Sequence, residues 1–169
     1  MTATPYEFVA IAGSGTIATG LAAVATTSSR EVVLLVRSEE SGQRALAAVE
    51  KASRRIPGAS PERVSTTMDP TGLVEADLLV EAVIEDHAVK VDLLKTVAEA
   101  APSADLATTT SSLSVTALGN DSGYPERVYG LHVFNPVPSM KLVELVFPDA
   151  LEEAVAERAH DWCHMIEKT

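Results

Sequence analysis

A glycine-rich turn near the N-terminus constrains the fold of this chain more than any other feature. Segment 13–18 has the sequence GSGTIA, fits the pattern G-x-G-x-x-G/A and directly follows the apolar run 8–12. An alanine-rich, helix-forming segment (16–27) and a second apolar run (31–36) complete a strand–helix–strand unit of about 30 residues. This context predicts a dinucleotide-binding turn, with a purely structural turn as the alternative. The candidate cofactor-binding residues of the turn are Gly13, Gly15, Thr16, Ile17 and Ala18.

Each position of this turn has a physical reason. Gly13 permits the tight turn, Gly15 lets the backbone approach a pyrophosphate, and Ala18 keeps the helix close to the sheet. The helix that begins at Thr16 and Ile17 presents its free N–H groups to phosphate oxygens.

The rest of the chain continues the alternation of short apolar runs with helical segments. Predicted strands are 8–12, 31–36, 63–67, 77–84, 105–110, 128–134 and 142–147, and predicted helices are 16–27, 39–55, 88–101 and 151–168. Continuous apolar strands separated by helices indicate a parallel sheet covered on both faces. The expected fold is therefore α/β, a Rossmann-like, doubly wound and mostly parallel sheet, with residues 1–169 forming one dinucleotide-binding domain.

Charge and cysteine content exclude several classes of protein. The formal net charge of −11 argues against a nucleic-acid partner or an anionic membrane surface, since both need an excess of Lys and Arg. No apolar run reaches the roughly 18 residues that span a bilayer. The single cysteine, Cys163, allows no intrachain disulfide, which favours a reduced, cytoplasmic setting.

The residues at the end of the second predicted strand bear on whether the cofactor is NAD or NADP. An acidic residue usually stands there and binds the ribose 2′-hydroxyl, but this chain has Val36, followed by Arg37 and Ser38. Without the acid nothing repels a 2′-phosphate, and Arg37 and Ser38 are able to bind one. NADP is slightly favoured on this basis. The alternative is that Arg37 is a solvated charge and NAD binds with one contact fewer.

Four polar residues in the second half suit the oxidation of an alcohol. His132 titrates near neutrality and can take and return the hydroxyl proton. Glu144 lies in an apolar strand, where a carboxylate is costly unless it is paired, and an adjacent imidazole satisfies it. Ser111 follows a strand's carboxyl end, where ligands gather in this fold, and Asn135 follows the histidine strand.

The segment 130–144, GLHVFNPVPSMKLVE, resembles a signature of the 3-hydroxyacyl-CoA dehydrogenase family. The resemblance implies that His132 and Glu144 are the catalytic pair, that Ser111 contacts the substrate oxygen and that Asn135 holds the nicotinamide side. It also implies that Glu85 and Lys90 lie near the cofactor ribose, although an ordinary surface helix pair is almost as good an interpretation of these two. Members of this family continue into a helical second domain, which is absent from this chain.

Three functions remain open at this point. The first is hydride transfer between a nicotinamide cofactor and a 3-hydroxyacyl or 3-oxoacyl thioester, carried by coenzyme A or by an acyl carrier protein. The second is a sugar-acid dehydrogenase of the same superfamily, and the third is an inactive cofactor-binding or interaction module. Exposed apolar surface predicts self-association as a homo-oligomer. A metal site is not expected, since His160 and His164 lie one helical turn apart with no further ligand of suitable spacing.

Overall fold

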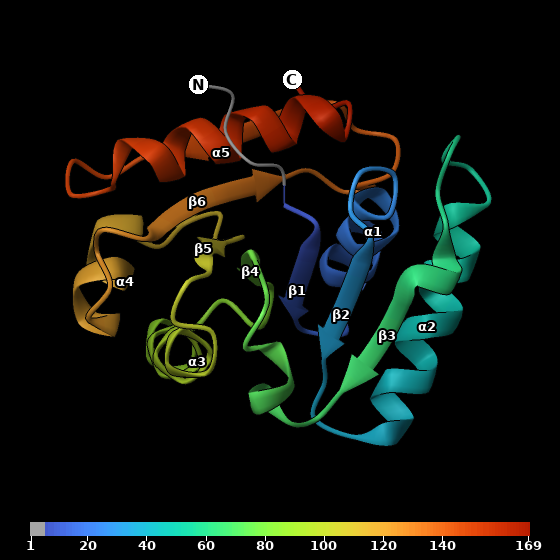
Figure 1. Ribbon diagram of the computed structural model, residues 1–169, viewed down its shortest axis with the longest axis horizontal. Coiled ribbons are helices and arrows are strands. Elements are labelled where there is room, and N and C mark those ends of the chain that lie inside the picture. The colour runs from blue at the N-terminus through green and yellow to red at the C-terminus, as the bar shows by residue number, and fades with distance from the viewer. Residues whose placement is uncertain (1–5) are drawn as a thin grey trace.

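The computed structural model describes residues 6–169, which form a seven-stranded sheet with helices on both faces (Figure 1). The elements are β1 (Phe8–Ala12), α1 (Thr16–Ala25), β2 (Glu31–Leu35), α2 (Glu39–Ser53), β3 (Val64–Thr67), β4 (Leu78–Glu81), α3 (His87–Ala100), β5 (Asp105–Thr108), α4 (Val115–Ser122), β6 (Val128–Val133), β7 (Val143–Val146) and α5 (Glu153–Met165), with short 3₁₀ helices at Pro61–Arg63 and Pro70–Leu73. The strand order is β3-β2-β1-β4-β5-β6-β7. All neighbouring strands pair in parallel except β6 and β7, which are antiparallel. The prediction of a doubly wound, mostly parallel α/β fold is confirmed.

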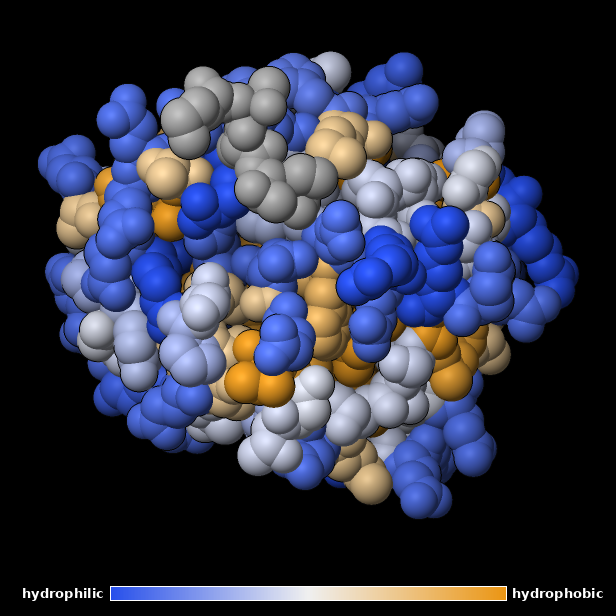
Figure 2. Space-filling view, in the orientation of Figure 1, coloured by the Kyte–Doolittle hydropathy of each residue, from blue (hydrophilic) through white to orange (hydrophobic). Residues whose placement is uncertain are grey.

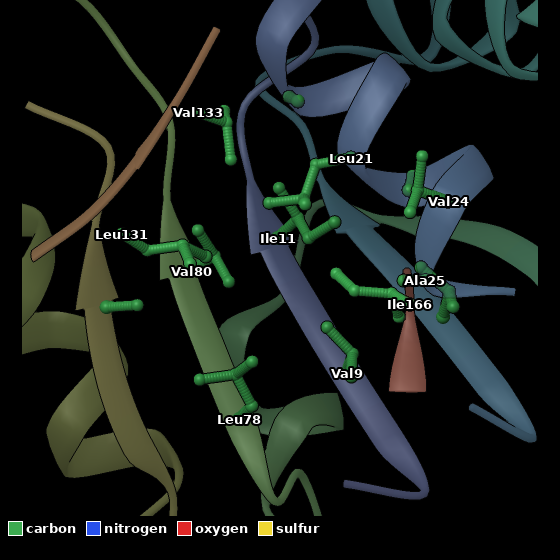
Figure 3. Packing of buried hydrophobic residues seen from close by; sticks show 14 of the residues in the cluster. Val9, Ile11, Leu21, Val24, Ala25, Leu78, Val80, Leu131, Val133 and Ile166 are labelled. Atoms are coloured by element: carbon green, nitrogen blue, oxygen red, sulfur yellow. The ribbon is translucent and has the colours of Figure 1, made fainter. Parts of the chain in front are cut away.

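Two apolar cores lie on opposite faces of this sheet. One core packs α1, α2 and α5 against the sheet, and it includes Leu21, Val49 and Trp162. Figure 3 shows how Leu21 and other residues of α1 lie over residues of β1 and β4. The second core packs α3 and α4 against the other face through residues such as Leu94 and Leu118. Because both faces are covered, the central strands are buried and read as continuous apolar runs.

The helix α5 is also tied to the sheet by a partly buried ion pair. Arg158 donates from Nε and Nη2 to the two carboxylate oxygens of Asp105 at the start of β5, at 2.7 and 2.6 Å. Such a bidentate pair fixes direction as well as distance. It holds α5 alongside β6 (Figure 1), on the flank of the sheet that carries His132.

Besides shifts of one or two residues at the ends of other elements, the structure differs from the prediction in three places. An additional helix, α4, follows β5; it is capped by the Ser114 hydroxyl at its start and by Gly123, with φ +88°, at its end. β4 ends at Glu81 instead of Ile84, so that residues 82–86 form a loop. α5 ends at Met165, and Lys168 lies beyond it instead of in its last turn. Lys168 is buried and bonds to backbone carbonyls of a distant loop, which no local pattern encodes.

Candidate cofactor cleft and catalytic pair

A cleft of about 920 Å³ lies at the carboxyl ends of the strands. From β1 the sheet continues through β2 and β3 on one side and through β4 to β7 on the other, so the strand order reverses between β1 and β4. The cleft therefore lies at the position where this fold binds ligands. The glycine turn, the ends of β2 and β4, the loop after β5 and the end of β6 line it. Figure 2 shows apolar side chains grouped near the middle of the viewed face of the molecule, with hydrophilic side chains around them.

The glycine turn has the geometry that a dinucleotide requires. Gly13 has φ +140°, and a Cβ placed on it would lie 2.4 Å from the Ala82 carbonyl oxygen and 3.3 Å from Ala18 Cβ. Gly15 is the N-cap of α1 and provides no side chain to cap the helix. Thr16 and Ile17 line the cleft, while Ala18 is buried beneath it. The uncapped N–H groups of α1 therefore face the cleft, where a pyrophosphate would accept from them.

In this fold the residues after the second strand contact the adenosine ribose of a bound dinucleotide, so the residues after β2 would form the adenosine end of the cleft. Val36 is buried, and Arg37 is exposed and lines the cleft. Within residues 6–169 the Arg37 guanidinium makes no ion pair. Ser38 does not line the cleft; its hydroxyl instead accepts from Ser41 N at 3.2 Å and caps α2. Arg37 is thus the better placed of the two residues to contact a 2′-phosphate.

His132 and Glu144 form a close pair at the other end of the cleft. They lie directly opposite each other in the antiparallel pairing of β6 with β7, with His132 Nδ1 2.6 Å from Glu144 Oε2. His132 lines the cleft, and its ring packs against Phe134 with centroids 4.6 Å apart. With Nδ1 held by the carboxylate, Nε2 is the ring nitrogen left for a substrate.

The expected burial of Glu144 is wrong, although the pairing is present. Its side chain is 58% exposed, whereas that of His132 is 23% exposed. The reason is that β7 lies at the end of the strand order, so that only alternate residues, Val143 and Leu145, pack on the core. The carboxylate faces solvent in this chain and pairs with the histidine because the register places it there.

Glu85 organises the loop that carries Ser111. Its Oε1 accepts from Thr110 Oγ1, from Ser111 N at 3.0 Å and from Ser112 N at 3.1 Å. Partial burial opposes ionisation of Glu85, but these hydrogen bonds outweigh it and lower its pKa to about 2. Glu85, Ser111 and Asn135 all line the cleft. The peptide bond between Asn135 and Pro136 is cis.

Lys90 is not a surface residue, so the interpretation of Glu85 and Lys90 as a surface helix pair is wrong. Its ammonium is buried, does not line the cleft, and lies 2.6 Å from Glu81 Oε1 and 3.4 Å from Glu85 Oε2. Glu81 is also fully buried and accepts from Thr108 Oγ1 at 2.6 Å and from Val83 N at 2.8 Å. This network connects the ends of β4 and β5 to the loop of Ser111.

Sequence reasoning missed Glu81, for which a signal existed. A carboxylate inside the buried run DLLVEAVI has to be paired, and Lys90 is the cation that follows it on the next helix. The pairing itself depends on which face of α3 turns toward the sheet. Leu94 and Val97 on α3 are buried together with Lys90, so that face is the inner one.

Within residues 6–169 no group of three or more His, Cys, Asp or Glu side chains is arranged to hold a metal ion. Cys163 is packed in the first core, and burial raises the pKa of its thiol to about 12. None of the helices in the described part of the chain is long and apolar enough to cross a membrane.

The fold and the cleft define a dinucleotide-binding domain of the Rossmann type. Residues 8–169 match the model of the family described as 3-hydroxyacyl-CoA dehydrogenase, NAD binding domain, and the chain belongs to this family. Family membership indicates a nicotinamide cofactor.

Individual proteins and one solved structure are similar to this chain over nearly its whole length. The chain is 38% identical over 163 residues to 3-hydroxyadipyl-CoA dehydrogenase of Escherichia coli K12, covering 90% of this chain and 34% of that protein. It is 33% identical over 179 residues to mitochondrial hydroxyacyl-coenzyme A dehydrogenase of Sus scrofa, covering 96% and 57%. The solved structure of 3-hydroxybutyryl-CoA dehydrogenase from Escherichia coli K12 superposes with a TM-score of 0.88 at 35% identity, covering 98% of this chain and 38% of that one. The chain thus spans between about a third and just over half of the length of these relatives.

Proposed function

We propose that this chain is the cofactor-binding and proton-transferring part of an oxidoreductase that interconverts 3-hydroxyacyl and 3-oxoacyl thioesters. The observation that carries the proposal is the His132–Glu144 pair, at 2.6 Å, in the same cleft as the glycine turn. The names of the relatives, which refer to hydroxyacyl-CoA dehydrogenases, support the thioester as substrate class.

In the proposed reaction His132 Nε2 takes the proton of the substrate hydroxyl, and in the reverse direction it returns that proton. Glu144 fixes the tautomer of the ring through Nδ1 and stabilises the imidazolium that forms. The bound nicotinamide supplies the hydride acceptor or donor. The Ser111 hydroxyl and the Asn135 amide, which line the cleft, orient the reacting oxygen and the carboxamide end of the cofactor.

For the cofactor we propose a preference for NADP over NAD, supported by Arg37 at the adenosine end and by Val36 in the position after β2 where an acid usually stands. The competing proposal is NAD binding with Arg37 left in solvent, and a direct comparison of the two cofactors separates them.

For the substrate, both coenzyme A and an acyl carrier protein remain as carriers of the acyl group. Because the relatives are longer than this chain, we expect further protein to complete the acyl pocket and turnover by these 169 residues alone to be weak.

Self-association, or contact with such further protein, is a proposal that exposed apolar side chains near β7 support. These side chains are Met140, Leu142, Val146 and Phe147. The lone, buried Cys163 is in keeping with a proposed cytoplasmic location.

The test compares His132→Ala with His160→Ala, which removes an exposed histidine of α5 as a matched control. Oxidation of NADH or NADPH is followed with a short 3-oxoacyl-CoA, and cofactor affinity is measured by calorimetry. We expect His132→Ala to lower the rate by about 10²–10⁴-fold and to leave the dissociation constant of the cofactor within about twofold.

Other outcomes point to the alternatives. Full activity of His132→Ala contradicts the assignment of the base. Turnover of a sugar acid, but not of the thioester, favours the related dehydrogenase class. Cofactor binding without turnover of either substrate favours a module that binds but does not catalyse.

A further inference from the structure

Lys168 is a buried lysine with an unusual set of partners. It is 4% exposed and follows the end of α5, and within residues 6–169 its ammonium has no carboxylate partner. Nζ donates instead to the carbonyl oxygens of Val137, at 2.5 Å, and Met140, at 2.6 Å. Both carbonyls belong to the connection between β6 and β7, here called the 134–142 connection.

The 134–142 connection joins the two halves of the catalytic pair. It begins directly after the strand of His132, carries Asn135 into the cleft, and ends just before the strand of Glu144. The backbone beside Lys168 contacts its far end: Thr169 N donates to Lys141 O at 2.8 Å, and Val143 N donates to Thr169 O at 3.0 Å.

The other side of the same connection rests on the helix of the glycine turn. Val137 is 1% exposed, and a Cβ placed on Gly20 in α1 would lie 3.0 Å from Val137 Cβ. The connection is therefore held between α1, whose N-terminus faces the pyrophosphate position, and the ammonium of Lys168.

Burying this ammonium is costly in isolation. Burial lowers the pKa of Lys168, because removal from water disfavours the charged form. An apolar side chain would fill the same space without that cost, so the gain has to lie in what the two carbonyl contacts fix. What they fix is the path of the backbone that positions Asn135.

We infer that Lys168 is a positioning residue for the nicotinamide end of the cleft, which it orders through the Val137 and Met140 carbonyls. This inference rests on the proposed function, since it requires that a nicotinamide lies beside His132 and Asn135. The adenosine end, at Arg37, is formed by other elements, so ligand contacts there should not depend on Lys168.

The experiment compares NADH with ADP-ribose, which has the adenosine and pyrophosphate parts but no nicotinamide. Both ligands are titrated by calorimetry into the wild type, into Lys168→Met, which keeps most of the length of the side chain, and into Lys95→Met, which alters an exposed lysine on α3. We expect Lys168→Met to weaken NADH by about tenfold, as loss of an ordering charged hydrogen bond implies. ADP-ribose should stay within about twofold, and Lys95→Met should leave both affinities unchanged.

A second measurement follows the 134–142 connection itself. Ser139 N and Met140 N donate to Pro136 O, each at 3.0 Å, and amide hydrogen exchange at these two groups should become faster in Lys168→Met. If Lys168→Met does not fold, Lys168→Gln, which retains one N–H donor group, is measured in the same way with a smaller expected effect.

The outcomes separate the inference from the proposal on which it rests. Equal weakening of NADH and ADP-ribose, or unchanged NADH affinity in a folded variant, overturns the positioning role of Lys168. Failure of the wild type to bind either ligand overturns the proposed function instead.

Discussion

Removing the buried charge of Lys90 should destabilise the domain strongly. Lys90→Met keeps most of the side-chain volume but leaves the fully buried Glu81 without its cation. Breaking a buried pair from one side costs about 3–5 kcal/mol. Glu81 retains hydrogen bonds from Thr108 and Val83, which places the expected loss at the lower end, about 3 kcal/mol. At about 2–4 °C per kcal/mol for a domain of this size, the melting temperature should fall by about 6–12 °C.

Thermal unfolding followed by circular dichroism at pH 7 measures this loss, with Lys95→Met on the exposed side of α3 as control. A second substitution distinguishes charge from packing. Glu81→Gln in the Lys90→Met background removes the unpaired charge, and the amide can still accept from Val83 N and donate to the Thr108 hydroxyl. The double variant should therefore recover much of the lost stability. A melting temperature of Lys90→Met within about 2 °C of the wild type, or a double variant less stable than the single one, would refute this reasoning.

Three further predictions concern the cleft. Gly13→Ala would place a Cβ 2.4 Å from the Ala82 carbonyl oxygen at a φ of +140°, so the turn would have to change shape. Calorimetry should then show at least a tenfold loss of NADH affinity, which is about 1.4 kcal/mol. Unchanged affinity would mean that the turn does not hold the pyrophosphate. The pKa of Glu85 is lowered from 4.5 to about 2, so its contribution to stability is full above pH 4.5 and is lost as the pH falls toward 2. Urea unfolding of Glu85→Gln should therefore show destabilisation at pH 6 that largely disappears at pH 2.5, and an equal loss at both pH values would contradict the lowered pKa. Arg37→Ala should weaken NADPH by about tenfold or more and NADH by less than about twofold; equal effects on both would assign Arg37 to solvent.

Local sequence patterns were sufficient for most of the fold. The glycine turn, the alternation of apolar runs with helical segments and the residue types of the proposed catalytic pair are local features, because they depend on the backbone freedom of glycine and on which residues avoid water. The helix α4 was missed because it is short and only its ends, Ser114 and Gly123, carry clear signals.

Tertiary structure decided how distant residues meet. The antiparallel register of β6 and β7 places Glu144 opposite His132 at an exposed edge, and no feature within β7 itself distinguishes that position from a buried one. Packing of α3 turned Lys90 inward to Glu81, and the end of the chain brought Lys168 to carbonyls about 30 residues earlier in the sequence. The sequence by itself determined which residues are suited to the cofactor and to proton transfer, because that depends on side-chain chemistry. Which of them lie at the cleft and which support it from beneath was decided only by the packing of helices on the sheet, because burial is a property of the folded chain.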